Sequence, residues 1–159
     1  MNGLSMTGIM KKWSDATVVD PAIQSFCLER YGKQAKIFTG FDRKPPKDED
    51  CPHVVLLPDI KNTGMTHDNH HYSFIAGWVI KNAQKTESSD GLQITYSGIE
   101  ECEMLGDLVW NCICEINPSY PLSKSDVEYY PTTFFPQFKG LMTVTLDVPV
   151  VLGANLPPY

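Results

Sequence analysis

The sequence predicts an α+β domain in two layers, with a mainly antiparallel sheet of about five strands and two helices on one face of the sheet. Two observations lead to this prediction. Strand-like segments follow one another through polar loops, which favours antiparallel pairing, and two segments show helical spacing of apolar residues. The predicted order is α-β-β-β-α-β-β. The 159 residues fit a single domain, 1–159, in which 1–15 and 153–159 are expected to be loose termini.

The first helix is predicted from Pro21 to Tyr31. Asp20 is a good N-cap, proline is tolerated at the first helical position, and Gly32 lies where a left-handed C-terminal residue is wanted. Apolar residues recur between these ends at helical spacing: Ile23, Phe26, Cys27 and Tyr31.

Three strands are predicted next. Segment 35–39 is β-branched and aromatic, and the mixed charges and prolines of 41–52 indicate a solvated loop. The continuous apolar run 53–57 closes at Pro58 and suits a buried strand. Segment 72–80 alternates with both faces at least partly apolar, so we expect it to be central in the sheet.

The second helix is predicted over 99–116, where one apolar stripe ends before Asn117-Pro118. Ser97 and Glu100 match a capping box at its start. Segment 92–96 stays open between a short strand and a lead-in to this helix. Acidic residues near the helix start are expected to form a solvated face that the helix dipole favours: Glu100, Glu101, Glu103 and Asp107.

Two strand candidates end the chain. Segment 126–132 is rich in tyrosine but contains Pro131, and the strand from Leu141 onward is stronger. One face of the stronger strand is apolar: Met142, Val144, Leu146, Val148 and Val150. Pro149 cannot donate a ladder hydrogen bond, so we expect the end of this strand at a sheet edge or bulge.

Charge and hydropathy exclude several classes of partner. The formal net charge is -6, whereas sequence-specific nucleic-acid binding needs clustered lysine and arginine. No apolar run reaches the roughly 18 residues of a membrane span. Lys11-Lys12 follow the apolar start of the chain, which is the reverse of a secretory signal. We therefore expect a protein that is cytoplasmic when made, with no membrane or nucleic-acid partner.

One histidine cluster could hold a metal, because imidazole and carboxylate are common ligands of zinc and its neighbours. It comprises His67, Asp68, His70 and His71. The two adjacent histidines would point to opposite sides of a strand, and no His-x-x-x-His or paired-cysteine motif completes a site. We expect no functional metal here. A small metal-dependent enzyme that uses His67, His70 and His71 remains an alternative.

The five cysteines are expected to be reduced and mostly buried. Cys51 beside His53 could act as nucleophile and base, but no third residue orients the pair. Cys112 and Cys114 lie about 200° apart around a helix, so their thiolates could not converge on one ion. We therefore expect no catalytic residue, cofactor or small-molecule substrate, with a thiol enzyme built on Cys51 as the alternative.

Aromatic residues crowd a segment that prolines interrupt: Tyr120, Tyr129, Tyr130, Phe134, Phe135 and Phe138. Tyrosine and phenylalanine are favoured in protein interfaces, and they also pack loops onto their own core. Both interpretations stay open. A monomeric adaptor that grips a partner with this segment is a further alternative.

The residues 38–42 form a Gly-Phe-Asp-like turn, and Pro52 opens the apolar strand after it. With the long strand, the second helix and the closing strand, this order resembles the tail-terminator, minor tail or tail-completion proteins of long-tailed bacteriophages. Prophage proteins of the same phage-tail-protein-like fold share it. The resemblance covers roughly residues 16–152, although 81–96 and 118–136 are long for that pattern.

The resemblance implies a structural protein of a phage or prophage tail. Its subunits would form a homo-oligomeric ring, commonly a hexamer, that contacts tail-tube or head-completion proteins in the virion tail. A head-to-tail interface would close such a ring. The acidic balance of the chain would suit a lumen through which DNA passes.

Overall fold

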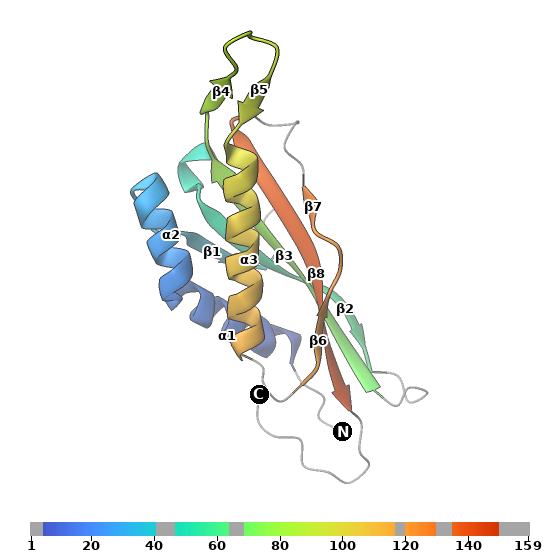
Figure 1. Cartoon of the computed structure of the whole chain (residues 1–159). Coiled ribbons are helices and arrows are strands. Elements are labelled where there is room, and N and C mark those ends of the chain that lie inside the picture. Colours follow the sequence, from blue (N-terminus) through green and yellow to red (C-terminus); the bar gives the residue numbers. More distant parts are fainter. Residues whose placement is uncertain (1–4, 41–46, 64–68, 117–119, 130–134, 150–159) are drawn as a thin grey trace.

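A computed structural model describes residues 5–40, 47–63, 69–116, 120–129 and 135–149 (Figure 1). The helices are α1 (Met6–Val19), α2 (Pro21–Tyr31) and α3 (Gly98–Ile116), with a 3-10 turn at Asp48–Asp50. The strands are β1 (Lys36–Thr39), β2 (His53–Asn62), β3 (Asn69–Lys81), β4 (Lys85–Glu87), β5 (Ile94–Tyr96), β6 (Leu122–Lys124), β7 (Glu128–Tyr129) and β8 (Gln137–Pro149). Among the described helices, none combines the length and apolar character needed to cross a membrane.

The main sheet is mixed and has six strands, against the five or so that the sequence predicts. Its order is β1-β2-β3-β8-β6, and β7 also pairs with β8. Only β1 and β2 run parallel, while the other pairs are antiparallel. β3 and β8 pair along their whole lengths, from Asn69 opposite Pro149 to Lys81 opposite Gln137. β3 is therefore central, as predicted. β4 and β5 pair with each other in a separate hairpin.

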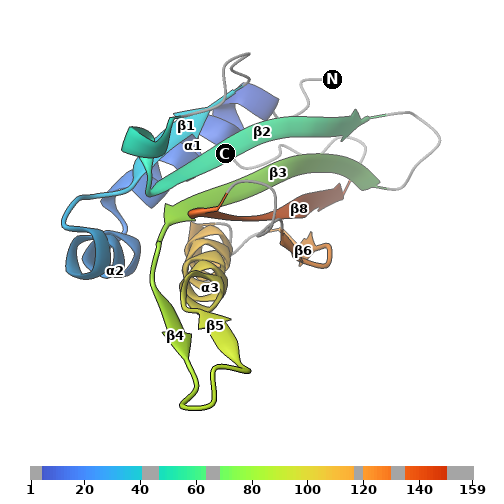
Figure 2. The ribbon, with the colours of Figure 1, turned by 90° about the horizontal axis from the view of Figure 1, so that it is seen from above.

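α1 and α3 cover the same face of this sheet, which confirms the predicted α+β class and its two layers. Trp78 of β3 donates from Nε1 to the Cys102 carbonyl of α3 at 2.7 Å. Phe74, on the same face of β3, packs against Trp13 of α1 with ring centroids 4.7 Å apart. Figure 2 shows α3 alongside β3 and β8. The predicted apolar face of β8 is buried at Met142, Val144, Leu146 and Val148, and Val150 lies outside the described residues.

Two glycines allow α3 and β8 to close around the Trp78 indole. A Cβ at Gly106 would lie 2.3 Å from the ring, and one at Gly140 would lie 2.5 Å from it. Both distances are far shorter than a van der Waals contact, so only glycine fits here without a shift of the ring. The indole is completely buried between the two layers.

The expectation of a loose terminus over 1–15 is wrong for residues 6–15, which belong to α1. The Ser5 hydroxyl caps this helix by accepting from the Gly8 N–H at 3.2 Å. Four residues at helical spacing are buried: Ile9, Met10, Trp13 and Thr17. In the described residues two helices, not one, thus precede β1. Residues 153–159 lie outside the described residues.

α2 has the predicted bounds and caps. The Asp20 carboxylate accepts from the Ile23 N–H at 2.9 Å, and Gly32 adopts the left-handed conformation with φ 71°. α3 also lies where predicted. The Ser97 hydroxyl, which the predicted capping box would use as the acceptor of a helix N–H, donates to the Gln84 carbonyl at 3.3 Å. This bond ties the start of α3 to the base of the hairpin.

Several strand boundaries differ from the prediction: β3 runs from Asn69 to Lys81, beyond the predicted 72–80, and β8 begins at Gln137, before the predicted Leu141. β2 continues beyond Pro58 to Asn62, with a register shift between Pro58 and Lys61. In β2 the backbone N–H and C=O groups of even-numbered residues face β1. Because β1 ends opposite Leu56, it does not pair with Pro58, and the missing N–H of this proline breaks no ladder bond. Within the predicted strand 126–132 the structure has β7 at Glu128–Tyr129, and 130–132 lie outside the described residues; β6 is a further short edge strand, and both strands pair with β8.

Candidate functional site

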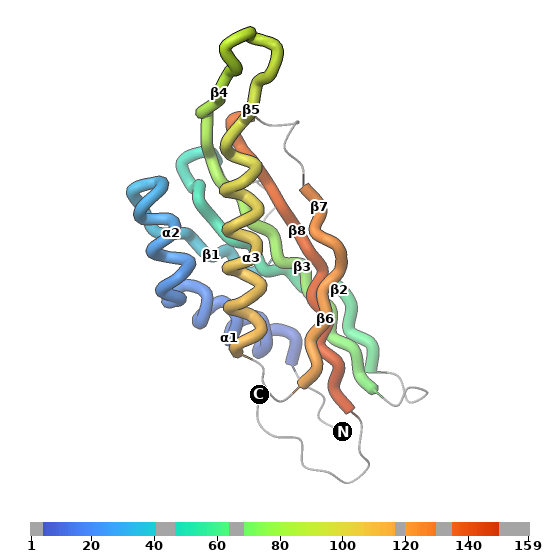
Figure 3. Tube along the Cα trace, viewed as in Figure 1, coloured from blue at the N-terminus to red at the C-terminus, as the bar shows by residue number. Residues whose placement is uncertain are grey.

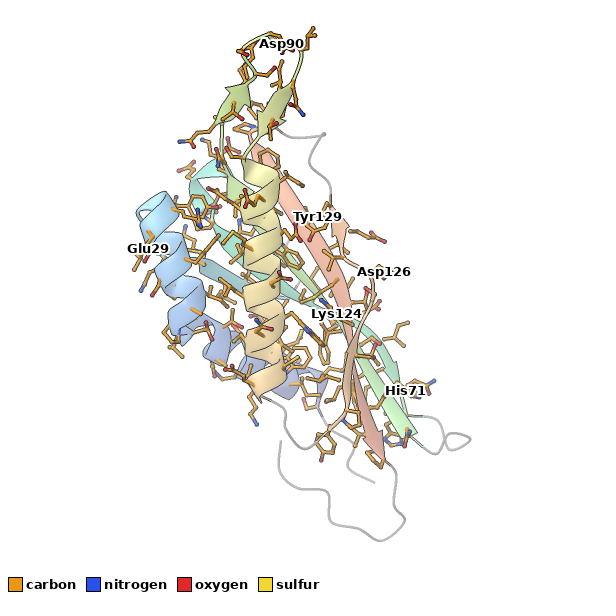
Figure 4. The ribbon with its side chains drawn as sticks, viewed as in Figure 1. Glu29, His71, Asp90, Lys124, Asp126 and Tyr129 are labelled. Atoms are coloured by element: carbon orange, nitrogen blue, oxygen red, sulfur yellow. The ribbon has the colours of Figure 1, made fainter. Side chains whose placement is uncertain are left out.

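The histidine cluster points in two directions. His70 is buried and lies opposite Val148 on the helix-covered face. His71 lies on the other face, where its Nδ1 hydrogen-bonds to Asp147 Oδ1 (Figure 4). Side chains alternate along a strand, so adjacent histidines separate as predicted. His67 lies outside the described residues, and within them no three His, Cys, Asp or Glu side chains group so as to hold a metal.

The His71–Asp147 pair belongs to a short polar ladder between β3 and β8. Next to it, the hydroxyls of Ser73 and Thr145 lie 3.1 Å apart. Each pair joins residues directly opposite in register. A one-residue slip would send these side chains to the apolar face, so the ladder stabilises the observed register.

Cys51 and His53 lie close together, with 3.8 Å between Sγ and Nδ1, and both are buried. Burial raises the pKa of the Cys51 thiol to about 11. Burial also lowers the pKa of the His53 imidazole to about 4. At neutral pH the pair is therefore a thiol beside a neutral imidazole. A cysteine nucleophile instead needs a lowered pKa and access to a substrate.

The other thiols are distributed as the helical pattern predicts. Cys27, Cys102 and Cys112 are buried, and burial raises the pKa of each thiol to about 11. Cys114 is exposed. Cys112 and Cys114 thus lie on different sides of α3.

Glu101 departs from the solvated acidic face that the sequence predicts. Its Oε2 accepts from the Tyr31 hydroxyl at 2.8 Å and from Asn82 Nδ2 at 3.0 Å. The Arg30 guanidinium lies 3.6 Å from its Oε1. Burial and the bond to Glu101 raise the pKa of Tyr31 well above its usual value. This carboxylate joins α2, α3 and the segment after β3.

The sequence contains one signal for Glu101. Positions 98, 101, 105 and 109 fall on one helical stripe, and the other three of these residues are buried. A carboxylate on that stripe needs partners when the helix packs. Because Glu100 and Glu103 are also glutamates, residue type alone does not separate Glu101 from its solvated neighbours.

The aromatic segment divides between core and surface. Tyr120 and Phe138 are buried in the core, whereas Tyr129 and Phe135 are exposed. Phe135 contacts Tyr96 of β5 with ring centroids 5.3 Å apart. Tyr130 and Phe134 lie outside the described residues. Packing onto the core therefore holds for Tyr120 and Phe138, and the interface interpretation stays a prediction for Tyr129 and Phe135.

Residues 84–97, here called the hairpin arm, extend beyond the two layers (Figures 1 and 3). All six strand residues of the arm are exposed. Its turn is closed internally, by Ser88 N–H to the Gln93 carbonyl and Gly91 N–H to the Ser88 carbonyl, both at 2.9 Å. Large apolar side chains lie at its surface: Leu92 (87% exposed), Ile94 (48%) and Tyr96 (43%).

A two-stranded hairpin is only marginally stable in water without further packing. The arm receives a contact from Phe135 at its base, but Leu92 near the turn remains almost fully exposed. Exposed apolar residues gathered on a projecting element are typical of an interaction site. The sequence does not decide between a short strand and a lead-in to the helix for 92–96, although the dipeptide Asp90-Gly91 favours a hairpin turn.

The edges of the main sheet offer less to a partner strand. Beyond Leu56, β2 has no neighbour on its outer side within the described residues. Pro58 has no N–H to donate there, and the register shift distorts the strand. Proline and bulges are known devices that protect a sheet edge from pairing. On the opposite side the edge strands are β6 and β7, which have only three and two residues, and very short edge strands are also a protection against pairing.

The chain matches no protein-family model, and no curated protein matches it. Geometry alone therefore distinguishes the candidate sites. The arm has the exposed apolar surface that an interaction site requires, whereas the described histidines and the Cys51–His53 pair have the geometry of structural groups.

Proposed function

We propose that the chain is a structural protein of a phage or prophage tail, a tail-terminator-like subunit that self-associates into a ring. The ring would contact tail-tube or head-completion proteins. The hairpin arm supports the self-association in this proposal, because it presents Leu92, Ile94 and Tyr96 away from the core of its own chain. Apolar side chains of this kind are stabilised when an interface removes them from water.

The enzyme alternatives receive less support from the same structure. A thiol enzyme would need Cys51 as a thiolate, and burial favours the neutral thiol at this position. A metal enzyme built on the histidines would need convergent ligands, and His70 and His71 occupy opposite faces of β3. These two observations favour a binding function.

The adaptor alternative binds a different partner through the aromatic segment, in which Tyr129 and Phe135 are exposed. Tyr96 and Phe135 form an exposed aromatic pair at the base of the arm, as in many protein interfaces. An adaptor would remain monomeric by itself, whereas a ring subunit associates with its own copies. Self-association therefore separates the two functions.

Sedimentation of the full chain over a range of concentrations tests the proposal. We expect the wild type to form a defined oligomer whose electron micrographs show closed rings. The Leu92→Asp variant should remain monomeric, because it places a charge in the contact. Ile60→Asp is the matched control, since Ile60 is also exposed (58%) but lies on β2. A wild-type chain that stays monomeric would favour the adaptor, and an open-ended polymer would contradict the ring.

A further inference from the structure

The hydrogen bonds of the hairpin arm show which of its backbone groups point outwards. The Ser88 N–H donates to the Gln93 carbonyl at 2.9 Å, and the Ser97 N–H donates to the Gln84 carbonyl at 3.4 Å. In an antiparallel pair, residues that exchange such bonds alternate with residues whose backbone groups point away from the partner strand. The outward N–H and C=O groups therefore belong to the residues between: Lys85 and Glu87 of β4, and Ile94 and Tyr96 of β5.

Both edges of the arm are open in the part of the chain that the structure describes. β4 and β5 pair only with each other, and all of their residues are exposed. The hydrogen bonds at the two ends extend the paired region beyond the strands themselves, to 84–88 and 93–97. Neither segment contains a proline, in contrast to the open edge of β2. The arm therefore offers a row of unpaired donors and acceptors on each side.

The arm also gains stability from any strand that joins it. A two-stranded hairpin is marginal in water, whereas three or more strands with an apolar face are stable. Ile94 and Tyr96 lie on the same face of the arm and are 48% and 43% exposed. β5 consists of two β-branched residues and one aromatic residue, which favour strands. A strand added along β5 would contact both apolar side chains directly.

We propose that β5 of one copy pairs with β4 of the next copy around the ring. The inference rests on the self-association proposed above and names its contact. A ring needs a head-to-tail interface, in which two different surfaces of each subunit meet. The two edges of the arm are such surfaces, and two arms side by side in the same orientation bring β5 antiparallel to β4 (Figure 1). Each arm would gain a strand on both sides, and the closed ring of arms would leave no open edge.

The side chains of the two edges fit this pairing. When the strands lie along the ring axis, all copies have the same height, so the levels within one arm repeat between arms. The neighbouring copy's Lys85 would then lie beside Tyr96, and its Glu87 beside Ile94. Outward backbone groups thus meet outward backbone groups. Charged β4 residues alternate with uncharged β5 residues around the ring, so no two like charges lie directly opposite each other.

Proline substitutions at outward positions test this pairing. Ile94→Pro removes an outward N–H from the β5 edge, and Glu87→Pro removes one from the β4 edge. Neither breaks a bond inside the arm, since a strand tolerates proline where the N–H faces solvent. Each variant alone should associate at least about 10-fold more weakly than the wild type, because a carbonyl of the neighbouring copy loses its donor. An equimolar mixture should form a 1:1 dimer in sedimentation, because one intact β5 edge meets one intact β4 edge.

Matched controls separate the backbone from the side chains. Ile94→Ala and Glu87→Ala shorten the same side chains and keep the N–H, so each should associate more tightly than the corresponding proline variant. Circular dichroism should show that every variant is folded. Amide hydrogen exchange, resolved to single residues by fragmentation in the mass spectrometer, gives a second measurement. The four outward N–H groups should exchange at least about 10-fold more slowly in the wild-type ring than in the Leu92→Asp monomer.

Each failure has its own signature. A wild type that is monomeric at every concentration would overturn both the ring and the strand pairing. A wild type that ends at a dimer would do the same, because two identical edges that pair with each other cannot close a ring. A wild-type ring whose outward N–H groups exchange as fast as in the monomer would overturn the strand pairing only. Proline variants that associate as tightly as their alanine controls, or a mixture without the 1:1 dimer, would also overturn the strand pairing only.

Discussion

Acidification should weaken the fold through one buried imidazole. His53 is 2% exposed at the start of β2, and its ring meets Phe38 edge-on at 5.5 Å. Burial lowers its pKa from 6.5 to about 4. As the pH falls, the unfolded chain binds a proton near pH 6.5, and the folded chain binds it only near pH 4. The stability from this residue is therefore present above pH 6.5 and is lost as the pH falls towards 4.

The size of the effect follows from the shift. One pKa unit corresponds to about 1.36 kcal/mol, so a fall from 6.5 to about 4 corresponds to about 3 kcal/mol in total. Most of this, about 2.5 kcal/mol, should already be lost at about pH 4.5. Urea unfolding of the wild type at several pH values between about 7 and 4.5 measures the loss.

The His53→Asn variant isolates this contribution. Carboxylates also titrate in this range, but they do so equally in both proteins, so the difference between the two pH profiles belongs to His53. We expect the free energy of unfolding of the variant to fall about 2.5 kcal/mol less than that of the wild type between about pH 7 and 4.5. The absolute stability of the variant does not matter for this comparison. Parallel profiles would refute the argument that burial holds the imidazole neutral.

Three further predictions concern α3. Gly106→Ala should lower the free energy of unfolding by about 1–3 kcal/mol, because overpacking against Trp78 exceeds the roughly 1 kcal/mol gain in helix propensity; a more stable variant in urea would contradict this. Glu101→Gln should cost about 1 kcal/mol in the same assay, because its bond to Tyr31 loses its charge; unchanged stability would mean that the carboxylate is not needed. A maleimide should label one thiol per folded chain, Cys114, and five in denaturant, as counted by mass spectrometry; rapid labelling of a second thiol in the folded chain would contradict the burial of the other four.

The sequence predicts those elements whose ends carry their own signals. Asp20 and Gly32 bracket α2 because the N-cap and the left-handed C-cap are local interactions. The long alternation of β3 reflects a strand buried over most of its length. α1 was missed because a chain terminus was expected to be loose, although Ile9, Trp13 and Thr17 recur at helical spacing.

Short exposed strands carry a weaker signal. β4 and β5 have water on both faces, so apolar residues have no reason to alternate along them. Only the turn dipeptide Asp90-Gly91 marks the hairpin. β6 and β7 are similar, because two or three residues are too few to show a period.

The candidate sites depend on contacts that no local pattern contains. Cys51 and His53 share one face of any extended segment because they are two positions apart. Their burial, which no local pattern contains, keeps both side chains neutral at pH 7. Glu101 has two acidic neighbours of the same type, and its partner Tyr31 lies 70 positions away along the chain. Pairs of this kind follow from packing of whole elements, so a sequence pattern can locate the residue without its role.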